Sequence, residues 1–368
     1  IEIDKNLCIG CTKCSRACEE IGISYLKMVP QENKRNKVAS RKDEGLMCIW
    51  CGQCTAVCPV DAIREQREIE DVKKILNDKT KIKIVQSAPS IRSSICEAFK
   101  LGNGINAEKK LNTLYRKLGF DKVFDVNFGA DITTVAEAAE LTERLKEETE
   151  YGIGKKLPMF TACCPAWVSF VEQYVPELIP NLTTARSPHI HSGIAYKTWW
   201  AEKEGINPKD IVVVSIMPCT AKKSEAKDER LNVNGLYPVD YVLTTRELAK
   251  LTKEREIDFA TLEDSEMDPY GGYSGAAAIY GASGGVMESA LRTAYKDITG
   301  NDLPKLDLID VRTDLGGYKR AEIDINGKKV KVAVVSTPKN VKKLLEEIKE
   351  DPHAVDYVEV MACPGGCI

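Results

Sequence analysis

After residue 80 the chain shows two alternating kinds of hydrophobic pattern. Short β-branched runs bounded by polar or turn-forming residues predict strands, and stretches with apolar residues every three or four positions predict amphipathic helices. The predicted strands are 82–87, 123–126, 157–160, 211–217, 241–244, 330–336 and 357–361. The predicted helices are 136–150, 165–174, 246–253 and 340–350. This alternation favours mostly parallel sheets covered by helices on both faces, and the length of the segment favours two α/β lobes.

The first 80 residues have a different pattern, dominated by two cysteine runs. Between the runs, the charged stretch 31–37 predicts a solvated loop or hairpin, and an amphipathic pattern within 65–80 predicts a helix that leads into the next domain. We therefore divide the chain into a small domain at 1–80 and a larger domain at 81–368.

Composition excludes several classes of protein. Of the 368 residues, 43% are hydrophobic and 29% charged, which is a globular balance and excludes a disordered or coiled-coil chain. No run approaches the ~18 apolar residues of a membrane helix, so we expect no membrane insertion. The net charge of −3 argues against a nucleic-acid surface. With only His189, His191 and His353, histidine-rich metal chemistry is disfavoured.

The fourteen cysteines are the exception to this ordinary composition. Disulfides are one interpretation, but disulfide-dense proteins are mostly small and secreted, whereas this chain is large and begins with a cysteine run instead of a signal peptide. Metal or iron–sulfur ligation, and a cytoplasmic location, are the favoured interpretation. Cys96 stands apart from the other cysteines, and we expect it in the core.

The spacing C-x2-C-x2-C-x3-C occurs twice near the N-terminus. In two-cluster ferredoxins the fourth cysteine of each run ligates the other cluster. That rule predicts one [4Fe-4S] cluster on Cys8, Cys11, Cys14 and Cys58, and a second on Cys48, Cys51, Cys54 and Cys18. A pair of zinc sites is the alternative, although zinc sites favour separated ligand pairs. Glu19 follows Cys18 where proline is usual. Two clusters in series would conduct electrons to a redox site in the larger domain.

Three further motifs carry cysteine, and each directly follows a predicted strand. They are Phe160-Thr-Ala-Cys163-Cys164-Pro-Ala-Trp167, Met217-Pro-Cys219-Thr-Ala-Lys222-Lys-Ser-Glu225 and Met361-Ala-Cys363-Pro-Gly-Gly-Cys367. Ligands of parallel α/β sheets gather at the carboxyl ends of strands, so these motifs can converge on one buried site. The alternative is that these cysteines are small core residues, since cysteine buries readily.

These motifs resemble the signature loops of the FeFe hydrogenases, T-S-C-C-P-x-W, M-P-C-x-x-K-x-x-E and M-A-C-x-G-G-C. The resemblance covers nearly the whole chain and includes 262–269 and 284–292. It implies a two-lobed α/β active-site domain with parallel and mixed sheets flanked by helices, preceded by a small α+β ferredoxin-like domain. It also implies reversible oxidation of H2 to protons and electrons.

The resemblance further implies a third [4Fe-4S] cluster, held by Cys164, Cys219, Cys363 and Cys367, with Cys367 bridging to a two-iron subsite. That subsite carries carbon monoxide, cyanide and azadithiolate ligands and is supplied by maturation proteins. Four soft thiolates suit iron–sulfur binding. By the same resemblance Lys222 binds a cyanide, and a lysine offers a point charge and three donors.

Other residues take roles only through this resemblance. Cys163 matches the thiol that passes protons to the azadithiolate. Glu140 and Glu137 match proton-relay positions, Thr183 stands where serine is usual, and Glu225, a further candidate acid, lies in the lysine motif. Without the resemblance we would interpret each acid as a surface helix carboxylate. Pro89, Ser90, Met217 and Met361 match residues lining the pocket, and Gly281, Gly284 and Gly285 lack the side chains that would keep the backbone away from metal ligands.

Departures from the family pattern are also visible. Ala162 replaces the usual serine before Cys163, and Tyr280 stands where phenylalanine is common. The chain stops at Ile368, where family members continue with a Gly-rich loop and helices, so we expect the C-terminus to be truncated.

Two other functions share these motifs. A hydrogen-sensing regulatory protein has the same fold but often lacks the relay cysteine, whereas Cys163 is present here. Hydrogenase-like iron–sulfur assembly proteins keep cluster cysteines but lack the two-iron subsite, and the presence of Cys163, Lys222 and Glu225 argues against that class. No G-x-G-x-x-G follows a strand to open a helix, so we expect ferredoxin or another redox subunit as electron partner.

Overall fold

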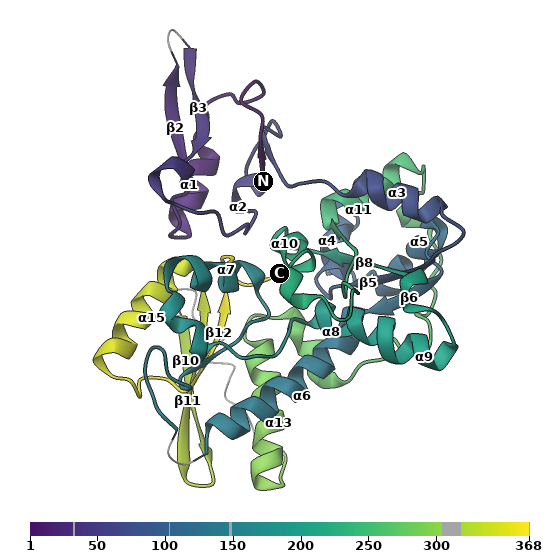
Figure 1. Ribbon diagram of the computed structural model, residues 1–368. Helices are drawn as coiled ribbons and strands as arrows, with labels where there is room; N and C mark the ends of the chain where they lie inside the picture. Colours follow the sequence, from purple (N-terminus) through teal and green to yellow (C-terminus); the bar gives the residue numbers. More distant parts are fainter. Residues whose placement is uncertain (32–33, 103, 147–148, 304–317, 368) are drawn as a thin grey trace. The chain divides into compact units, whose positions relative to one another are not determined.

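The computed structural model describes residues 1–368 except 32–33, 103, 147–148, 304–317 and 368 (Figure 1). The chain divides into two compact units that alternate along the sequence. The first unit comprises Ile1–Gln66, Glu137–Thr184 and Val286–Gly366, and the second comprises Arg67–Ala136, Ala185–Gly285 and Cys367.

The N-terminal part of the first unit is a small α+β structure. It contains two antiparallel ribbons, β1 (Glu2–Ile3) with β4 (Ile63–Arg64) and β2 (Leu26–Gln31) with β3 (Lys34–Ser40), together with helices α1 (Lys13–Glu20) and α2 (Gln53–Ala56) and a 3-10 turn at Lys42–Glu44. Of the loop or hairpin predicted at 31–37, the described residues follow the hairpin, since Gln31 pairs with Lys34; residues 32–33 lie outside the description. This part is bonded to the rest of its unit, because the Tyr174 hydroxyl donates to the Met47 carbonyl at 2.6 Å and the Lys339 amide donates to Ile21.

A mixed four-stranded sheet forms the rest of the first unit, in the order β10-β11-β12-β7. Three strands are parallel, and β10 pairs antiparallel with β11 at one edge. The strands are β7 (Met159–Phe160), β10 (Tyr318–Ile325), β11 (Lys328–Ser336) and β12 (Tyr357–Met361), and the helices are α7 (Pro165–Tyr174), α13 (Gly285–Thr299), α15 (Pro338–Glu350) and the later half of α6 (Val126–Arg144), with a 3-10 turn at Pro176–Asn181.

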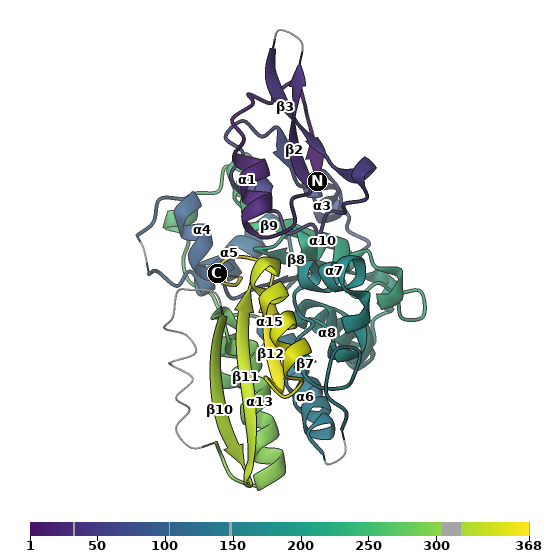
Figure 2. The same cartoon turned by 90° about the vertical axis from the view of Figure 1, so that its left-hand side faces the viewer.

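The core of this sheet is built from α6, α13 and β11. Leu141 and Leu291 pack with Val332 in one buried cluster, so these two helices cover one face of the sheet. Helix α15 lies along the sheet (Figure 2), with an apolar stripe of Val341, Leu344 and Ile348 buried. The helix spacing of these residues is the amphipathic pattern that the sequence shows.

The second unit contains a fully parallel sheet in the order β6-β5-β8-β9. Its strands are β5 (Ile82–Ser87), β6 (Lys122–Asp125), β8 (Ile211–Met217) and β9 (Tyr241–Thr244). Its α-helices are α3 (Ile69–Asn77), α4 (Ile91–Ala98), α5 (Glu108–Leu118), α8 (Pro188–Ala195), α9 (Ala201–Glu204), α10 (Ala221–Ala226), α11 (Thr245–Glu254) and α12 (Gly275–Ala278), with a π turn at Tyr196–Trp200 and 3-10 turns at Pro208–Asp210, Glu229–Leu231, Phe259–Thr261 and Ile279–Gly281.

The order of this sheet reverses between β5 and β8. The chain leaves β5 for β6 on one side, whereas β8 pairs with the other side of β5 and continues to β9. In open α/β sheets such a reversal opens a crevice at the carboxyl ends of the two strands, where ligands bind. All seven residues of β8 are buried, which explains why six of them are apolar.

The predicted bounds of β5, β8, β9, β12 and α7 are confirmed. The predicted helix 136–150 is wrong at both ends, because α6 covers Val126–Arg144. Its first turns contain Gly129 and β-branched residues, which are poor helix formers. Packing overrides propensity there, since a Cβ at Gly129 would lie 2.0 Å from the Pro188 carbonyl oxygen. Cys96 is buried, as predicted.

Candidate functional site

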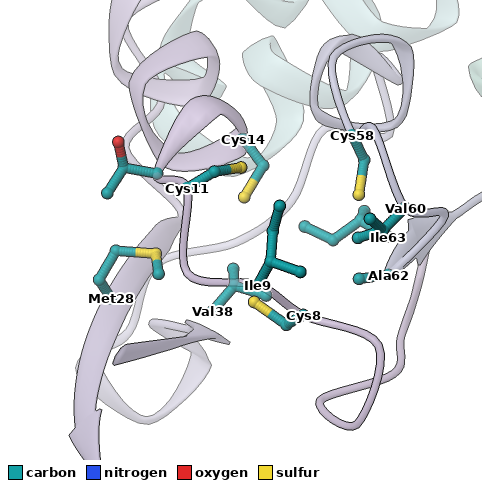
Figure 3. Close-up of a pocket in the computed structure, with 11 residues that line it drawn as sticks. Cys8, Ile9, Cys11, Cys14, Met28, Val38, Cys58, Val60, Ala62 and Ile63 are labelled. Carbon is teal, nitrogen blue, oxygen red and sulfur yellow. The ribbon is translucent and has the colours of Figure 1, made fainter. Parts of the chain in front are cut away.

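Four cysteines from the two N-terminal runs surround one pocket (Figure 3). Cys8, Cys11 and Cys14 come from the first run and Cys58 from the second, which is the set that the ferredoxin rule predicts. The rest of the lining is mostly apolar: Ile9, Met28, Val38, Val60, Ala62 and Ile63. Soft thiolates in an apolar pocket suit an iron–sulfur cluster.

The backbone of both runs follows the same left-handed pattern. The residue before the second cysteine has φ of 75° at Gly10 and 56° at Trp50, and the residue after it has φ of 65° at Thr12 and 77° at Gly52. Thr12 and Gly52 then cap α1 and α2, respectively. The repeated conformation gives the two runs the same backbone turn around their second cysteine.

The second predicted cluster would lie on Cys48, Cys51, Cys54 and Cys18. Burial, followed by the charges of Cys48 and Cys18, raises the pKa of Cys54 to about 12, so these thiols lie within electrostatic reach of one another. Iron must supply the positive charge that deprotonates them. Within the described ranges, no group of three or more His, Cys, Asp or Glu side chains is close enough to hold a single metal ion.

In the first unit, two of the strand-end cysteine motifs lie at the same edge of the mixed sheet. Cys163 and Cys164 follow β7, and Cys363 follows its parallel neighbour β12. Cys164 is the N-cap of α7 and Pro165 is the first helical residue, which sets the direction of the chain directly after the two cysteines. Cys163 is 8% exposed and Cys164 is 4% exposed.

In the second unit, Cys219 follows β8 at the reversal of strand order. Pro89 and Ser90 follow β5 at the same edge, and the Ala88 amide donates to the Ile216 carbonyl at 3.0 Å. Cys219 and Cys367 belong to this unit and Cys164 and Cys363 to the other, so the set of four ligands remains a prediction.

The glycines of the predicted pocket have more local surroundings. A Cβ at Gly281 would lie 3.6 Å from the Pro89 side chain, so these two predicted pocket residues are neighbours. Gly284 has φ of 90°. A Cβ at Gly285 would lie 1.8 Å from the Ile279 carbonyl oxygen. The lack of a side chain at Gly285 therefore allows close approach of the protein's own backbone at Ile279.

Lys222 and Glu225 form a mostly buried ion pair on α10. The Lys222 ammonium donates to Glu225 Oε2 at 2.8 Å, and His189 Nε2 lies 2.7 Å from the same oxygen. Burial alone would raise the pKa of Glu225, but the Lys222 charge and the His189 contact outweigh it and hold the pKa at about 2. Glu225 is therefore ionised at neutral pH.

Glu140 is bound by a set of donors within the first unit. The Thr183 hydroxyl and the Thr184 amide donate to its Oε2 at 2.7 and 2.8 Å, and the Arg144 guanidinium donates to Oε1. Burial opposes ionisation, but these donors together lower the pKa of Glu140 below its ordinary value. The structure thus brings together two predicted relay residues, Glu140 and Thr183.

Glu137, one helical turn before Glu140, has a contrasting environment. It is 1% exposed. Burial raises its pKa to about 8; the Tyr357 hydroxyl lowers the value, whereas the Glu359 carboxylate raises it further. Glu137 is therefore largely protonated at neutral pH, and it can exchange its proton near that pH.

Sequence reasoning missed several partners of these residues: His189, Arg144, Thr184, Tyr357 and Glu359. A signal existed for Arg144, which lies four residues after Glu140 on one helix. Glu359 interrupts an otherwise apolar strand and is fully buried. Nothing local in the sequence connects His189 with Glu225, because the contact joins two separate helices.

Comparison with known proteins assigns the family. The profile for the C-terminal domain of the iron-only hydrogenase large subunit matches residues 81–368, and that of a 4Fe-4S dicluster domain matches residues 1–65. The chain belongs to the iron-only hydrogenase family. The predicted resemblance is confirmed, whereas the boundary at residue 80 stays a prediction.

Relatives with curated names support this assignment. Iron hydrogenase 1 of Clostridium pasteurianum is 42% identical over 373 residues, and the NADP-reducing hydrogenase subunit HndD of Solidesulfovibrio fructosivorans is 40% identical over 371 residues. These alignments cover 100% and 99% of this chain but 64% and 63% of the relatives. The chain thus spans less than two thirds of the length of either relative. The periplasmic [Fe] hydrogenase large subunit of Nitratidesulfovibrio vulgaris is 39% identical over 369 residues, which are 100% of this chain and 85% of that protein.

A solved structure confirms the fold class. The apo [FeFe]-hydrogenase of Chlamydomonas reinhardtii superposes with a TM-score of 0.72 at 37% identity, covering 82% of this chain and 83% of that chain. The α/β architecture with parallel and mixed sheets flanked by helices is therefore that of the hydrogenases.

A more distant group of relatives has a different role. Cytosolic iron-sulfur assembly component 3 of Pongo abelii is 27% identical over 338 residues, covering 87% of this chain and 69% of that protein.

Among the described residues, no helix is both long and apolar enough to cross a membrane. One relative is named periplasmic, so the cytoplasmic location stays a prediction.

Proposed function

We propose that this chain is the catalytic part of an FeFe hydrogenase that interconverts H2 with two protons and two electrons. The observation that carries the proposal is the mostly buried Lys222–Glu225 pair, which begins three residues after Cys219. A lysine ammonium fixed by a carboxylate offers charge and hydrogen bonds to an anionic ligand of a metal site. A protein that held only an iron–sulfur cube would have no cyanide for it to bind.

The residues present fit the proposed cofactors. Three cysteines of one run and Cys58 of the other line one apolar pocket, and the second set of four is linked electrostatically. We propose a cluster on each. A third [4Fe-4S] cluster on Cys164, Cys219, Cys363 and Cys367 would connect to the two-iron subsite, whose carbon monoxide, cyanide and azadithiolate ligands maturation proteins supply. That subsite supplies the chemistry of hydrogen cleavage when bound.

Proton transfer is the role we propose for the chain's own acids and thiol. Cys163 is adjacent to a proposed ligand without being one, so its thiol can hold and pass a proton. Glu137 keeps a proton at neutral pH, and Glu140 with Thr183 forms a hydrogen-bonded step. Groups whose pKa lies near the working pH exchange protons fastest, and this favours Glu137 as the central acid.

Electrons would pass through the two N-terminal clusters. One relative is named as a subunit of an NADP-reducing hydrogenase, so we propose a ferredoxin or another redox subunit as the partner of this chain.

The second candidate is an iron–sulfur assembly protein, favoured by the relatives at 27% identity. Hydrogen production with a strong artificial reductant separates the two functions, because that reductant bypasses the physiological partner. Protein matured together with the two-iron subsite should produce hydrogen, and protein that contains only the cubes should not. Equal inactivity of both preparations would favour the assembly role.

A further inference from the structure

A chain of hydrogen bonds inside the second unit runs from the parallel sheet to the Lys222–Glu225 pair. Gln86 on β5 donates from Nε2 to the His189 carbonyl at 2.9 Å and to Ser215 Oγ at 2.8 Å. A backbone carbonyl can only accept a hydrogen bond, so this contact fixes which end of the Gln86 amide is nitrogen. The other end, Oε1, accepts from the Ser192 hydroxyl, in agreement with that assignment.

Two contacts determine the tautomer of a neutral His189, one with Ser215 and one with Glu225. Because Ser215 Oγ accepts from Gln86, its own hydrogen is available to His189 Nδ1, which lies 3.3 Å away. The ionised Glu225 carboxylate can only accept, so Nε2 carries the hydrogen of a neutral ring and Nδ1 is the acceptor. His189 Nε2 donates that hydrogen to Glu225 Oε2, the oxygen that also accepts from Lys222.

Packing holds this imidazole in place. The side chain of His189 is fully buried. Its helix, α8, has two close backbone contacts. A Cβ at Gly193 on α8 would lie 2.2 Å from the Pro238 carbonyl oxygen, and a Cβ at Gly129 on α6 would lie 2.0 Å from the carbonyl oxygen of Pro188 on α8. Burial and the Lys222 charge lower the pKa of His189 below its ordinary value, although Glu225 opposes them. A neutral imidazole leaves the full charge of Glu225 to Lys222.

We propose that His189 is a positioning residue for Lys222: as the neutral Nε2–H tautomer it fixes the Glu225 carboxylate, which in turn fixes the direction of the Lys222 ammonium. The inference rests on the proposed function, in which Lys222 binds a cyanide of the two-iron subsite. His189 acts through Glu225 and Lys222. Its effect is to set the geometry and charge of the group that does bind the cyanide.

The first test uses protein that contains its [4Fe-4S] clusters without the two-iron subsite. With only three histidines in the chain, nitrogen-15 histidine NMR can resolve each ring, and the signal lost in His189→Gln identifies His189. We expect a neutral ring with hydrogen on Nε2, and the same tautomer with a shifted Nδ1 signal in Ser215→Ala, which removes the donor to Nδ1. An Nδ1–H tautomer or an imidazolium at neutral pH would overturn the proposal.

The second test loads the protein with a two-iron complex that carries carbon monoxide, cyanide and azadithiolate, and records the infrared bands. His189→Leu should displace the cyanide bands by more than their width, and His189→Gln, which keeps an N–H donor, should restore them. Ser215→Ala should displace the cyanide bands less than His189→Leu does. It replaces His189→Leu as the test variant if His189→Leu fails to fold. A purely structural role would change the amount of loaded protein and not the band positions.

His191→Gln is the matched control, because His191 lies on the same helix but its Nδ1 contacts Thr133; its cyanide bands should match wild type. Cyanide bands of folded His189→Leu at wild-type positions would overturn the positioning role. Wild-type protein that gains no such bands would refute the proposed function, and with it the role of Lys222, while the first test would still decide the tautomer.

Discussion

The two cysteine-rich regions of this chain are built in different ways. In residues 1–66 all eight cysteines come from two contiguous runs, and a repeated left-handed backbone places them. The strand-end cysteines come from three motifs far apart in the sequence and from both compact units. The first region carries its geometry locally, whereas the second depends on the whole fold and on partners such as Lys222 and Glu140. Substitutions should therefore have separable effects in the two regions.

The largest effect is expected from removing a proposed ligand of the strand-end region. Cys219→Ala should abolish both hydrogen production and the infrared bands of the two-iron subsite, because the cube that anchors it loses a thiolate. Cys58→Ala should damage only an N-terminal cluster and leave those bands. Loss of the bands in both variants would show that the two regions are not independent.

Removing the proposed relay thiol should come next. Cys163→Ala should retain all clusters and infrared bands while hydrogen production falls by ~100-fold or more, the usual effect of losing a positioned acid or base. Cys163→Asp should recover part of the rate, since a carboxyl group can also pass a proton. Near wild-type turnover in Cys163→Ala would exclude it from the mechanism and favour the sensing role.

Glu140→Ala should slow turnover by at most roughly 100-fold, again with intact clusters, because it removes acid–base help further from the metal. Glu143→Ala on the same helix is the control, since Glu143 is exposed. An equal decrease of turnover in the two variants would show that Glu140→Ala acts by altering the helix and not by removing a proton-transfer group.

Glu137 should make stability depend on pH. Its folded pKa, about 8, lies above the ordinary value of a glutamate, so its contribution is fully present below that ordinary pKa and is lost as the pH rises through 8. Thermal unfolding of Glu137→Gln should therefore decline less than wild type between about pH 5 and 8. Identical profiles would show that Glu137 is ionised in the folded protein.

The smallest effect concerns the local geometry of the first region. Gly10 and Gly45 both have positive φ, but a Cβ at Gly10 would lie 2.6 Å from the Asn36 carbonyl oxygen, whereas one at Gly45 meets nothing. Gly45→Ala should cost about 1 kcal/mol of stability from backbone strain alone, and Gly10→Ala should cost more and weaken cluster retention. Absorbance of the clusters during thermal unfolding measures both variants.

Much of the fold could be predicted because its signals are local. Strands β5, β8, β9 and β12 are short runs rich in apolar and β-branched residues, and their bounds follow from the pattern. The start of α6 could not be predicted, because Gly129 is favoured there by contact with Pro188, which is distant in sequence. β10 alternates exposed and half-buried residues at a sheet edge and has no continuous apolar run that would mark it as a strand.

The candidate site was predictable to the extent that motifs carry it. Lys222 and Glu225 lie three residues apart on one helix, so their pairing is a local property. His189 reaches Glu225 only because α8 packs beside α10, and Tyr357 reaches Glu137 only through a sheet that forms between distant segments. The opposite pKa shifts of Glu137 and Glu140 depend on such contacts between distant segments, and the sequence pattern does not reveal these contacts.

The most direct test of the central claim is the infrared spectrum of the anaerobically matured wild-type protein, recorded under argon and then under hydrogen. Metal-bound carbon monoxide and cyanide absorb where proteins do not. We predict that both kinds of band are present under argon and that they shift under hydrogen as the site is reduced. A matured protein with intact [4Fe-4S] clusters but without these bands, or with bands that hydrogen leaves unchanged, would contradict its assignment as a hydrogenase.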